Sequence, residues 1–113
     1  MKARDDSTTA SRQGAATARE QYLRLTLGLE RVAQLSQRQV LGRIALDATR
    51  TGYRVGSRTS VDVLRSLETV YRDEREMIGA RYEVILAGLR LKAAAASLEM
   101  EDIARINTLL TGD

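Results

Sequence analysis

The side chains that could carry out chemistry in this sequence are nearly all carboxylates, hydroxyls and guanidinium groups, because its 113 residues include no cysteine and no histidine. Thiolate nucleophiles, disulfides, imidazole metal ligands and the usual general base near neutral pH are therefore excluded. The two lysines, Lys2 and Lys92, and the scattered carboxylates form no recognisable acid/base pair. The sequence thus predicts a protein that is not an enzyme and needs no metal or cofactor.

Arginine is the other side chain with a recognisable chemistry. Arg24, Arg31 and Arg38 recur every seven residues and would share one helix face, where they could bind phosphate groups. No aromatic residue is interleaved with them to stack on bases, so a solvated face is favoured. The alternative function is that of a small cytoplasmic helical hairpin that dimerises and binds nucleic acid through this Arg-rich first helix.

The elements that must position these side chains are helices. Charged residues make up 29% of the sequence, and it contains no Pro, Phe or Trp, which is typical of long exposed helices. No alternating pattern predicts a strand, and no apolar run of about 18 residues predicts a helix that spans a bilayer. The first residues lack the apolar core of a signal peptide, so we expect a cytoplasmic chain or a piece of a longer one.

We expect an all-α fold: a long antiparallel coiled-coil helical hairpin followed by a short C-terminal helix, with no β-barrel strands. The predicted parts are a frayed start over 1–11, a first long helix over 12–50, a tip turn over 51–60, a second long helix over 61–97 and a short helix over 99–110. Charge favours the antiparallel pairing modestly, because residues 1–60 carry 11 basic and 5 acidic side chains and residues 61–113 carry 7 and 10.

Apolar residues in the second helix keep a strict seven-residue period. One series is Val63, Val70, Met77, Val84 and Leu91, and the adjacent series is Leu64, Tyr71, Ile78 and Ile85. This period indicates coiled-coil packing, and the width of the apolar face indicates more than one neighbour. We therefore expect self-association. In the first helix Val40, Leu41 and Ile44 continue an apolar stripe, whereas the charged run 72–76 resembles a solvated face.

The only break between the two helical patterns lies near the midpoint. Gly52 and Gly56, with hydroxyl residues around them, supply the permissive backbone that a reversing connection needs. Thr59 or Ser60 can cap the second helix, and Asp62 would lie in its first turn, where the helix dipole favours a negative charge.

The segment that contains this break, Ala48–Leu64, resembles the signature of the TolC-like outer-membrane efflux proteins. The resemblance continues in the family's order and spacing through residues 80–83, 89–94 and 98–107, and covers about residues 20–110. It corresponds to the last helical pair of the family's second repeat and the short helix after it. The first repeat and the barrel strands have no counterpart in this sequence.

The resemblance implies a role in transport. Members of the family are trimers with a long periplasmic α-helical tunnel, and they form the exit duct for substrates driven by an inner-membrane pump. This chain would be a fragment of the tunnel wall, with its tip at the periplasmic entrance. The implied partners are further copies of the channel, a periplasmic adaptor protein and the pump complex, with no nucleic acid, and the parent protein would be in the outer membrane and periplasm.

The resemblance also assigns roles to residues of the tip. Tyr53 and Arg58 match the residues that hold the entrance closed, and Asp62 matches the carboxylate that lines the constriction. The turn that meets the adaptor corresponds to Val55, Gly56, Ser57 and Arg58. Many relatives carry a second carboxylate three residues after Asp62, but this sequence has Arg65 there, so we expect a rim of mixed charge.

Simpler roles for the same residues stay open. Tyr53 could be a hydrophobic staple across the turn, Arg58 a solvated loop charge and Asp62 only a favourable first-turn charge.

Overall fold

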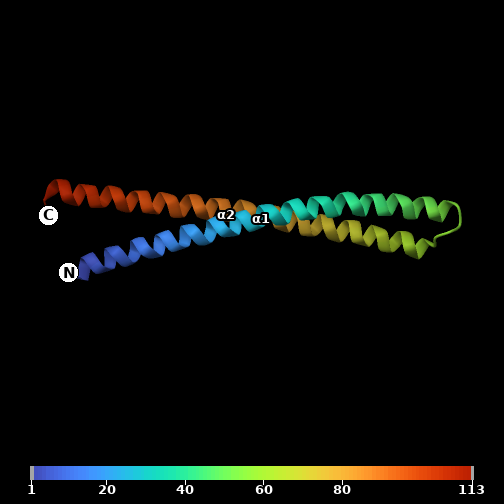
Figure 1. The fold of residues 1–113 in the computed structure, drawn as a ribbon, viewed down its shortest axis with the longest axis horizontal. Coiled ribbons are helices and arrows are strands. Elements are labelled where there is room, and N and C mark those ends of the chain that lie inside the picture. The colour runs from blue at the N-terminus through green and yellow to red at the C-terminus, as the bar shows by residue number, and fades with distance from the viewer. Residues whose placement is uncertain (1, 113) are drawn as a thin grey trace. The chain divides into compact units, whose positions relative to one another are not determined.

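The computed structural model describes the backbone of residues 2–112 and the side chains of residues 8–112. It contains two helices, α1 (Lys2–Arg54) and α2 (Ser60–Thr111), joined by the short turn of residues 55–59 (Figure 1). Because residues 2–112 contain no strand, the predicted all-α helical hairpin is confirmed. Neither helix, over the part that the structure describes, is long and apolar enough to cross a membrane.

Both helices are longer than the sequence pattern predicts. α1 is helical from Lys2 onward, within the start that we expected to be frayed, and it ends at Arg54; Met1 lies outside the described residues. The prediction of a separate short helix over 99–110 was wrong, because α2 continues without a break to Thr111. No glycine or proline occurs between residues 89 and 111 to end it, and the four alanines 93–96 are strong helix formers.

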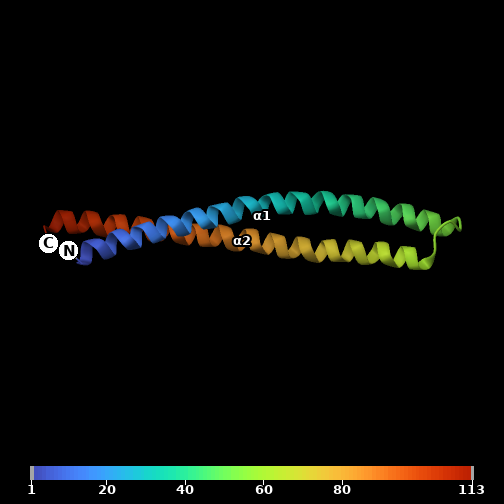
Figure 2. The same cartoon turned by 60° about the horizontal axis from the view of Figure 1, so that its bottom comes forward.

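The chain divides into two compact units, which we describe separately. The tip unit is residues 27–83, and the terminal unit combines 1–26 with 84–113. In each unit a part of α1 lies beside a part of α2 that runs in the opposite direction (Figure 2).

The α1 side of the tip unit turns a narrow face toward α2. The less exposed positions recur in alternating steps of four and three residues: Gly28, Val32, Leu35, Gln39, Gly42, Leu46 and Thr49. Leu35 packs with Met77 and Ala80 of α2 in a buried cluster that Val32 extends. Across the seam Ser66 Oγ donates a hydrogen bond to Thr49 Oγ1 at 3.2 Å. The period is that of a coiled coil, but most of these side chains are small or polar.

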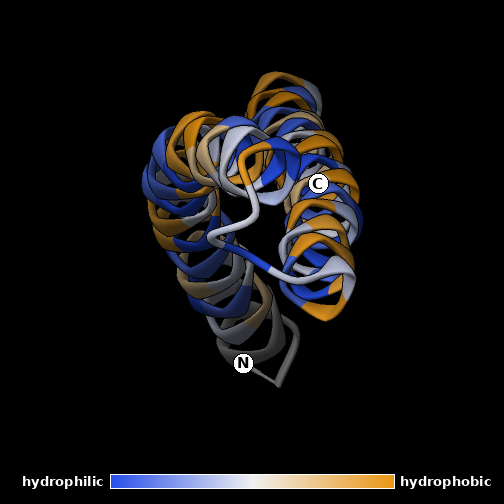
Figure 3. Cartoon of the chain, turned by 90° about the vertical axis from the view of Figure 1, so that its right-hand side faces the viewer, coloured by the Kyte–Doolittle hydropathy of each residue, from blue (hydrophilic) through white to orange (hydrophobic). Residues whose placement is uncertain are grey.

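Many large apolar side chains of the tip unit lie on the outside. On α2 the inward series runs through Val63, Val70 and Met77, as predicted, while the adjacent Leu64, Tyr71 and Ile78 are exposed. On α1 the apolar stripe is also exposed, with Leu41 at 66%. Figure 3 shows hydrophobic turns on the outward surfaces of both helices. Such surfaces are typical of an element that packs against further protein.

One carboxylate is fully buried in the seam of the tip unit. Asp73 is 0% exposed, and neither of its oxygens accepts a hydrogen bond within the described residues. Its nearest cations are Arg38, with Nη1 3.6 Å from Oδ1, and Arg72, with Nε 3.9 Å from the same oxygen. Gly42 faces it from α1, where an added Cβ would lie 3.6 Å from Asp73 Oδ2. Asp73 was therefore wrongly predicted to belong to a solvated charge run.

The terminal unit repeats the same design of small and polar contacts. An added Cβ at Gly14 would lie 2.9 Å from Leu98 Cδ2, so glycine permits a close approach there. Ser11 Oγ donates to Glu101 Oε2 at 3.1 Å and accepts a hydrogen bond from Arg105 Nη2. The large apolar residues near the end of α2 are exposed: Ile103, Ile106, Leu109 and Leu110.

The burial of Asp73 leads to a stability prediction. Asp73→Ala should raise the free energy of unfolding by about 1–3 kcal/mol, because it removes an unsatisfied buried carboxylate. The half-exposed Arg38 would keep its 2.9 Å bond to Glu76. Alanine fits the seam, since Ala80, Ala87 and Ala94 follow at seven-residue intervals. Urea unfolding followed by circular dichroism measures the change.

Glu76→Ala is the matched control. It removes the better-formed partner of Arg38, but both side chains of the pair are partly exposed to solvent, so the free energy of unfolding should change by less than about 1 kcal/mol. If Asp73→Ala had a lower free energy of unfolding than the unaltered chain, burial of the Asp73 carboxylate would not be destabilising and the prediction would be wrong.

Candidate functional site

The tip turn is closed by the carbonyl group of Gly52. It accepts hydrogen bonds from the backbone N–H groups of Ser57 at 2.9 Å and Arg58 at 3.1 Å, and from Ser57 Oγ at 3.2 Å. Gly56 has a φ of 83°, in the left-handed region that favours glycine. These bonds satisfy a carbonyl that the end of α1 would otherwise leave without a partner. The turn is thus a defined structure and not only a flexible link.

Gly52 also makes room for the side chain of Arg58. An added Cβ at Gly52 would lie 2.5 Å from Arg58 Cγ and 3.1 Å from Ser57 Oγ, closer than van der Waals contact allows. The aliphatic stem of Arg58 therefore lies directly over the backbone of α1. A side chain at position 52 would displace this stem, so glycine is needed for the observed position of Arg58.

The start of α2 is fixed by a reciprocal cap between Thr59 and Asp62. The backbone N–H of Thr59 donates to Asp62 Oδ2 at 2.9 Å, and the N–H of Asp62 donates to Thr59 Oγ1 at 3.2 Å. This is a capping box with aspartate in place of the usual glutamate. Of the two residues that could cap the helix, Thr59 is the one that does.

The cap changes the acidity of Asp62. Its hydrogen bonds to the backbone and side chain of Thr59, together with the nearby positive charges of Arg58 and Arg65, lower the pKa of this carboxyl below its ordinary value. The carboxylate therefore stays ionised at neutral pH.

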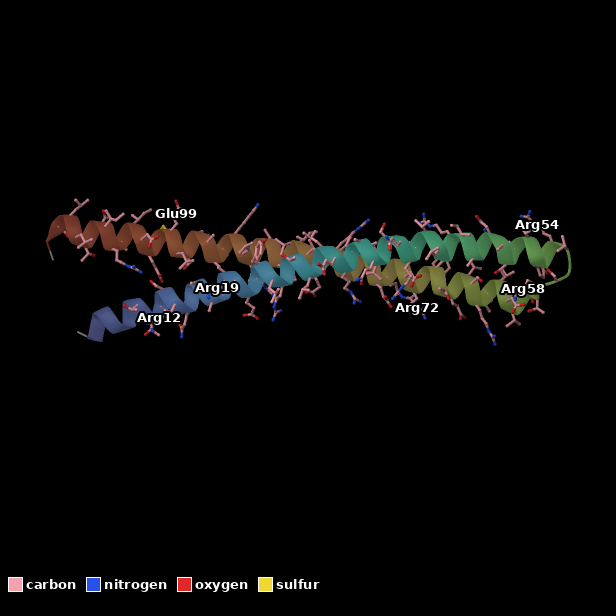
Figure 4. All side chains as sticks on the ribbon, in the orientation of Figure 1. Arg12, Arg19, Arg54, Arg58, Arg72 and Glu99 are labelled. Carbon is pink, nitrogen blue, oxygen red and sulfur yellow. The ribbon has the colours of Figure 1, made fainter. Side chains whose placement is uncertain are left out.

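The structure brings the predicted site residues together on the tip unit. Tyr53 lies in the last turn of α1 and is 53% exposed, and Val55 is the most exposed apolar residue of the turn. Tyr53 makes no side-chain hydrogen bond within the described residues, so it does not contact Arg58 through its hydroxyl group. Arg58 is near enough to Asp62 to affect its pKa, but no ion pair joins them. Figure 4 shows Arg54 and Arg58 at the turn end.

The Arg-rich face of α1 is partly neutralised. Arg24 Nη2 pairs with Glu20 Oε1 at 2.9 Å, and Arg38 Nη1 pairs with Glu76 Oε2 at 2.9 Å. Two of the three arginines with a seven-residue spacing thus have acidic partners. Residues whose side chains are described include no cluster of three or more acidic groups that could hold a metal ion.

Sequence reasoning missed two features of the tip unit. The seat that Gly52 provides for Arg58 depends on how the two helix ends face each other, and no local pattern signals it. The burial of Asp73 has a signal, because it lies three residues after Val70 and four before Met77, on the same face of α2 as the inward series.

Together, a helical hairpin with outward apolar surfaces and a structured tip defines a class of protein element that packs side by side with other helices. The chain is also similar to curated outer-membrane proteins. The chain is 31% identical over 103 residues to outer membrane protein TolC of Escherichia coli (strain K12), which covers 91% of this chain and 21% of that protein. It is 30% identical over 102 residues to the protein of the same name from Salmonella enteritidis, with 90% and 21% covered.

A third relative, outer membrane protein TolC of Vibrio cholerae serotype O1, is 37% identical over 71 residues, which are 63% of this chain and 16% of that protein. No family model matches the chain. These similarities confirm the predicted resemblance to the TolC-like outer-membrane efflux proteins. The chain spans about a fifth of the length of the first two relatives.

The lowered pKa of Asp62 predicts how the tip responds to acid. A depressed pKa means that ionised Asp62 stabilises the folded state above the ordinary pKa of an aspartate, and that this stabilisation is lost as the pH falls through the lower pKa of the folded state. Asp62→Asn should therefore reduce stability at neutral pH and flatten its decline in acid. Urea unfolding between neutral pH and pH 2 measures both effects.

Glu68→Gln provides the control for this experiment. It makes the same chemical change on α2 at an exposed carboxylate that has no ion pair or side-chain hydrogen bond within the described residues. An acid response of Asp62→Asn equal to that of the unaltered chain would show that the cap does not depend on the charge.

Proposed function

We propose that this chain forms part of the tunnel wall of a TolC-like outer-membrane efflux duct, with its tip at the periplasmic entrance. The observation that carries this proposal is the similarity to TolC over 91% of the chain. A helical hairpin whose large apolar side chains face outward is the kind of element that such a wall requires. The role is structural, without chemistry of its own.

The proposal includes partners for the outward surfaces. Neighbouring helices of a trimeric channel would cover the exposed apolar residues of α1 and α2, such as Leu41 and Ile78. A periplasmic adaptor protein would contact the tip, and an inner-membrane pump would drive the transport. The parent protein would be in the outer membrane and extend into the periplasm.

In this proposal Tyr53 and Arg58 hold the entrance closed, and Asp62 lines the constriction. Support comes from the position of Arg58, whose stem is held over Gly52, so that its guanidinium group extends from a fixed base. The adaptor would contact the exposed turn that contains Val55, Gly56, Ser57 and Arg58.

Nucleic-acid binding through the first helix is the alternative, and it has less support. Arg24 and Arg38 already have acidic partners, so fewer positive charges are available to neutralise phosphates. The similarity to TolC also covers this helix.

The closed entrance can be tested in a full-length channel that carries this segment. Tyr53→Phe together with Arg58→Ser should raise the single-channel conductance in planar bilayers, because both substitutions remove polar groups that would link neighbouring protomers. Tyr71→Phe with Arg75→Ser makes the same chemical changes farther along α2 and should leave the conductance unaltered. The same conductance in both double variants would rule out the gating role.

Self-association of the chain can be tested by sedimentation across micromolar concentrations. The exposed apolar surfaces should produce a concentration-dependent increase in mass. Leu41→Gln with Ile78→Gln should weaken association, whereas Arg31→Gln with Arg75→Gln, at exposed charged positions, should weaken it much less. If the unaltered chain stayed strictly monomeric, the proposal that it packs against further copies of the channel would be contradicted.

A further inference from the structure

Asp62 lies between two exposed arginines. Arg58 precedes it by four residues, in the turn, and Arg65 follows it by three residues on α2. Both guanidinium groups act electrostatically on the Asp62 carboxyl, but neither belongs to an ion pair of the described residues. Their positive charges therefore stay in contact with solvent on either side of the carboxylate.

Arg65 is placed to offset the charge of Asp62. Residues three apart on an α-helix are neighbours on one face, and their positions differ by a rise of about 4.5 Å along the axis. This rise is shorter than the distance over which physiological salt screens a charge, about 8 Å. A solute that approaches Asp62 therefore meets a positive charge beside the negative one.

The wider tip does not restore an excess of negative charge. Residues 47–68 contain three carboxylates, Asp47, Asp62 and Glu68, against four arginines. Glu68 is the next carboxylate along α2, and it lies six residues beyond Asp62, a rise of about 9 Å. Over this whole segment the tip is thus nearly balanced in charge.

The balance of charge matters wherever a channel is narrow. Rings of Asp or Glu select cations and rings of Arg or Lys select anions, because these charges lie close to every ion that passes. In the proposed trimer each protomer would contribute one negative charge from Asp62 and one positive charge from Arg65. A constriction with equal numbers of both signs has no net charge that would exclude anions.

We infer that Arg65 is the residue that determines charge selectivity at the entrance, where it makes the channel permeable to anionic as well as cationic solutes. This inference rests on the proposed function, because it requires Asp62 to line the constriction. The guanidinium group of Arg65 offsets the Asp62 carboxylate in each protomer. The solutes that pass thus include organic anions, which an unbalanced ring of carboxylates would repel.

The test measures the ion selectivity of a full-length channel that carries this segment. With a gradient of potassium chloride across a planar bilayer, the reversal potential gives the ratio of potassium to chloride permeability. The unaltered channel should have a ratio within about twofold of one, because the opposing charges cancel. Arg65→Asp should raise the ratio at least about threefold, since it adds a carboxylate beside Asp62. Arg65→Gln, which only removes the positive charge, should give an intermediate ratio.

Arg81→Asp is the matched control. It makes the same change of charge on α2 at an exposed arginine that belongs to no ion pair of the described residues. Arg81 lies sixteen residues after Arg65, which corresponds to about 160° around the helix, and its variant should keep the unaltered ratio. An equal rise in both variants would show a general effect of net charge and reject Arg65 as the determinant. A strong preference of the unaltered channel for potassium would also overturn the inference.

Asp62→Asn separates a failure of this inference from a failure of the proposed function. If Asp62 lines the constriction, loss of its charge should lower the ratio of potassium to chloride permeability at least about twofold. Such a shift, with an unaltered ratio in Arg65→Asp, would keep Asp62 at the constriction and reject the role of Arg65. Unaltered ratios in both variants, in channels that still conduct, would reject the constriction role of Asp62 and the inference with it.

Discussion

The two helices of the tip unit lie close together because little side-chain volume separates them. Gly42 and Thr49 of α1, with Ser66 and Ala80 of α2, place small groups where a wider hairpin would have leucine. A narrow seam brings the backbones together, but it buries little apolar area, and apolar area is the main source of stability. Many of the large apolar side chains are exposed instead, with Leu35, Leu46 and Met77 as buried exceptions. The tip unit thus exposes apolar side chains on both helices, which is typical of an element that packs against further protein.

Asp73 shows the cost of this arrangement. A buried carboxylate without hydrogen bonds would be replaced by an apolar residue in a hairpin selected for stability alone. It is tolerated because Gly42 leaves space for it and Arg38 lies beside it, with the guanidinium group still in contact with solvent. A buried charge in a regular seam can also specify one register over others, as polar residues do in coiled coils. In the observed alignment of the helices, Gly42 provides this space.

The sequence predicts the helices and the inward series of α2 because a seven-residue period of large apolar residues can be recognised without knowing the partner. The same reasoning fails for α1, because its polar and apolar residues do not follow the usual inside and outside positions. The positions that face α2 include Gln39 and Thr49, whereas Leu41 and Ile44 are exposed. A periodic pattern identifies an apolar face of a helix, but it does not show whether the other helix of the hairpin or another protein covers that face. The end of the hairpin was also misjudged, since Ser97 can cap a helix but does not end one when the residues on both sides continue it. The Thr59 cap was foreseeable because it depends on neighbouring residues, whereas the contact between Gly52 and Arg58 requires the turn to be folded first.

Asp62 has two roles to fulfil at the tip, one as a helix cap and one as a surface charge. Asp62 starts α2 through Oδ2, while no hydrogen bond within the described residues occupies Oδ1. The carboxylate can thus hold the helix and still present a negative charge, so the observed cap is compatible with the constriction role that we propose. Arg65 follows one turn later on α2, and its positive charge lowers the pKa of Asp62 and offsets its field. A second carboxylate at position 65 would instead have repelled Asp62 and raised its pKa. The tip therefore combines a carboxylate that caps α2 with exposed arginines at positions 58 and 65.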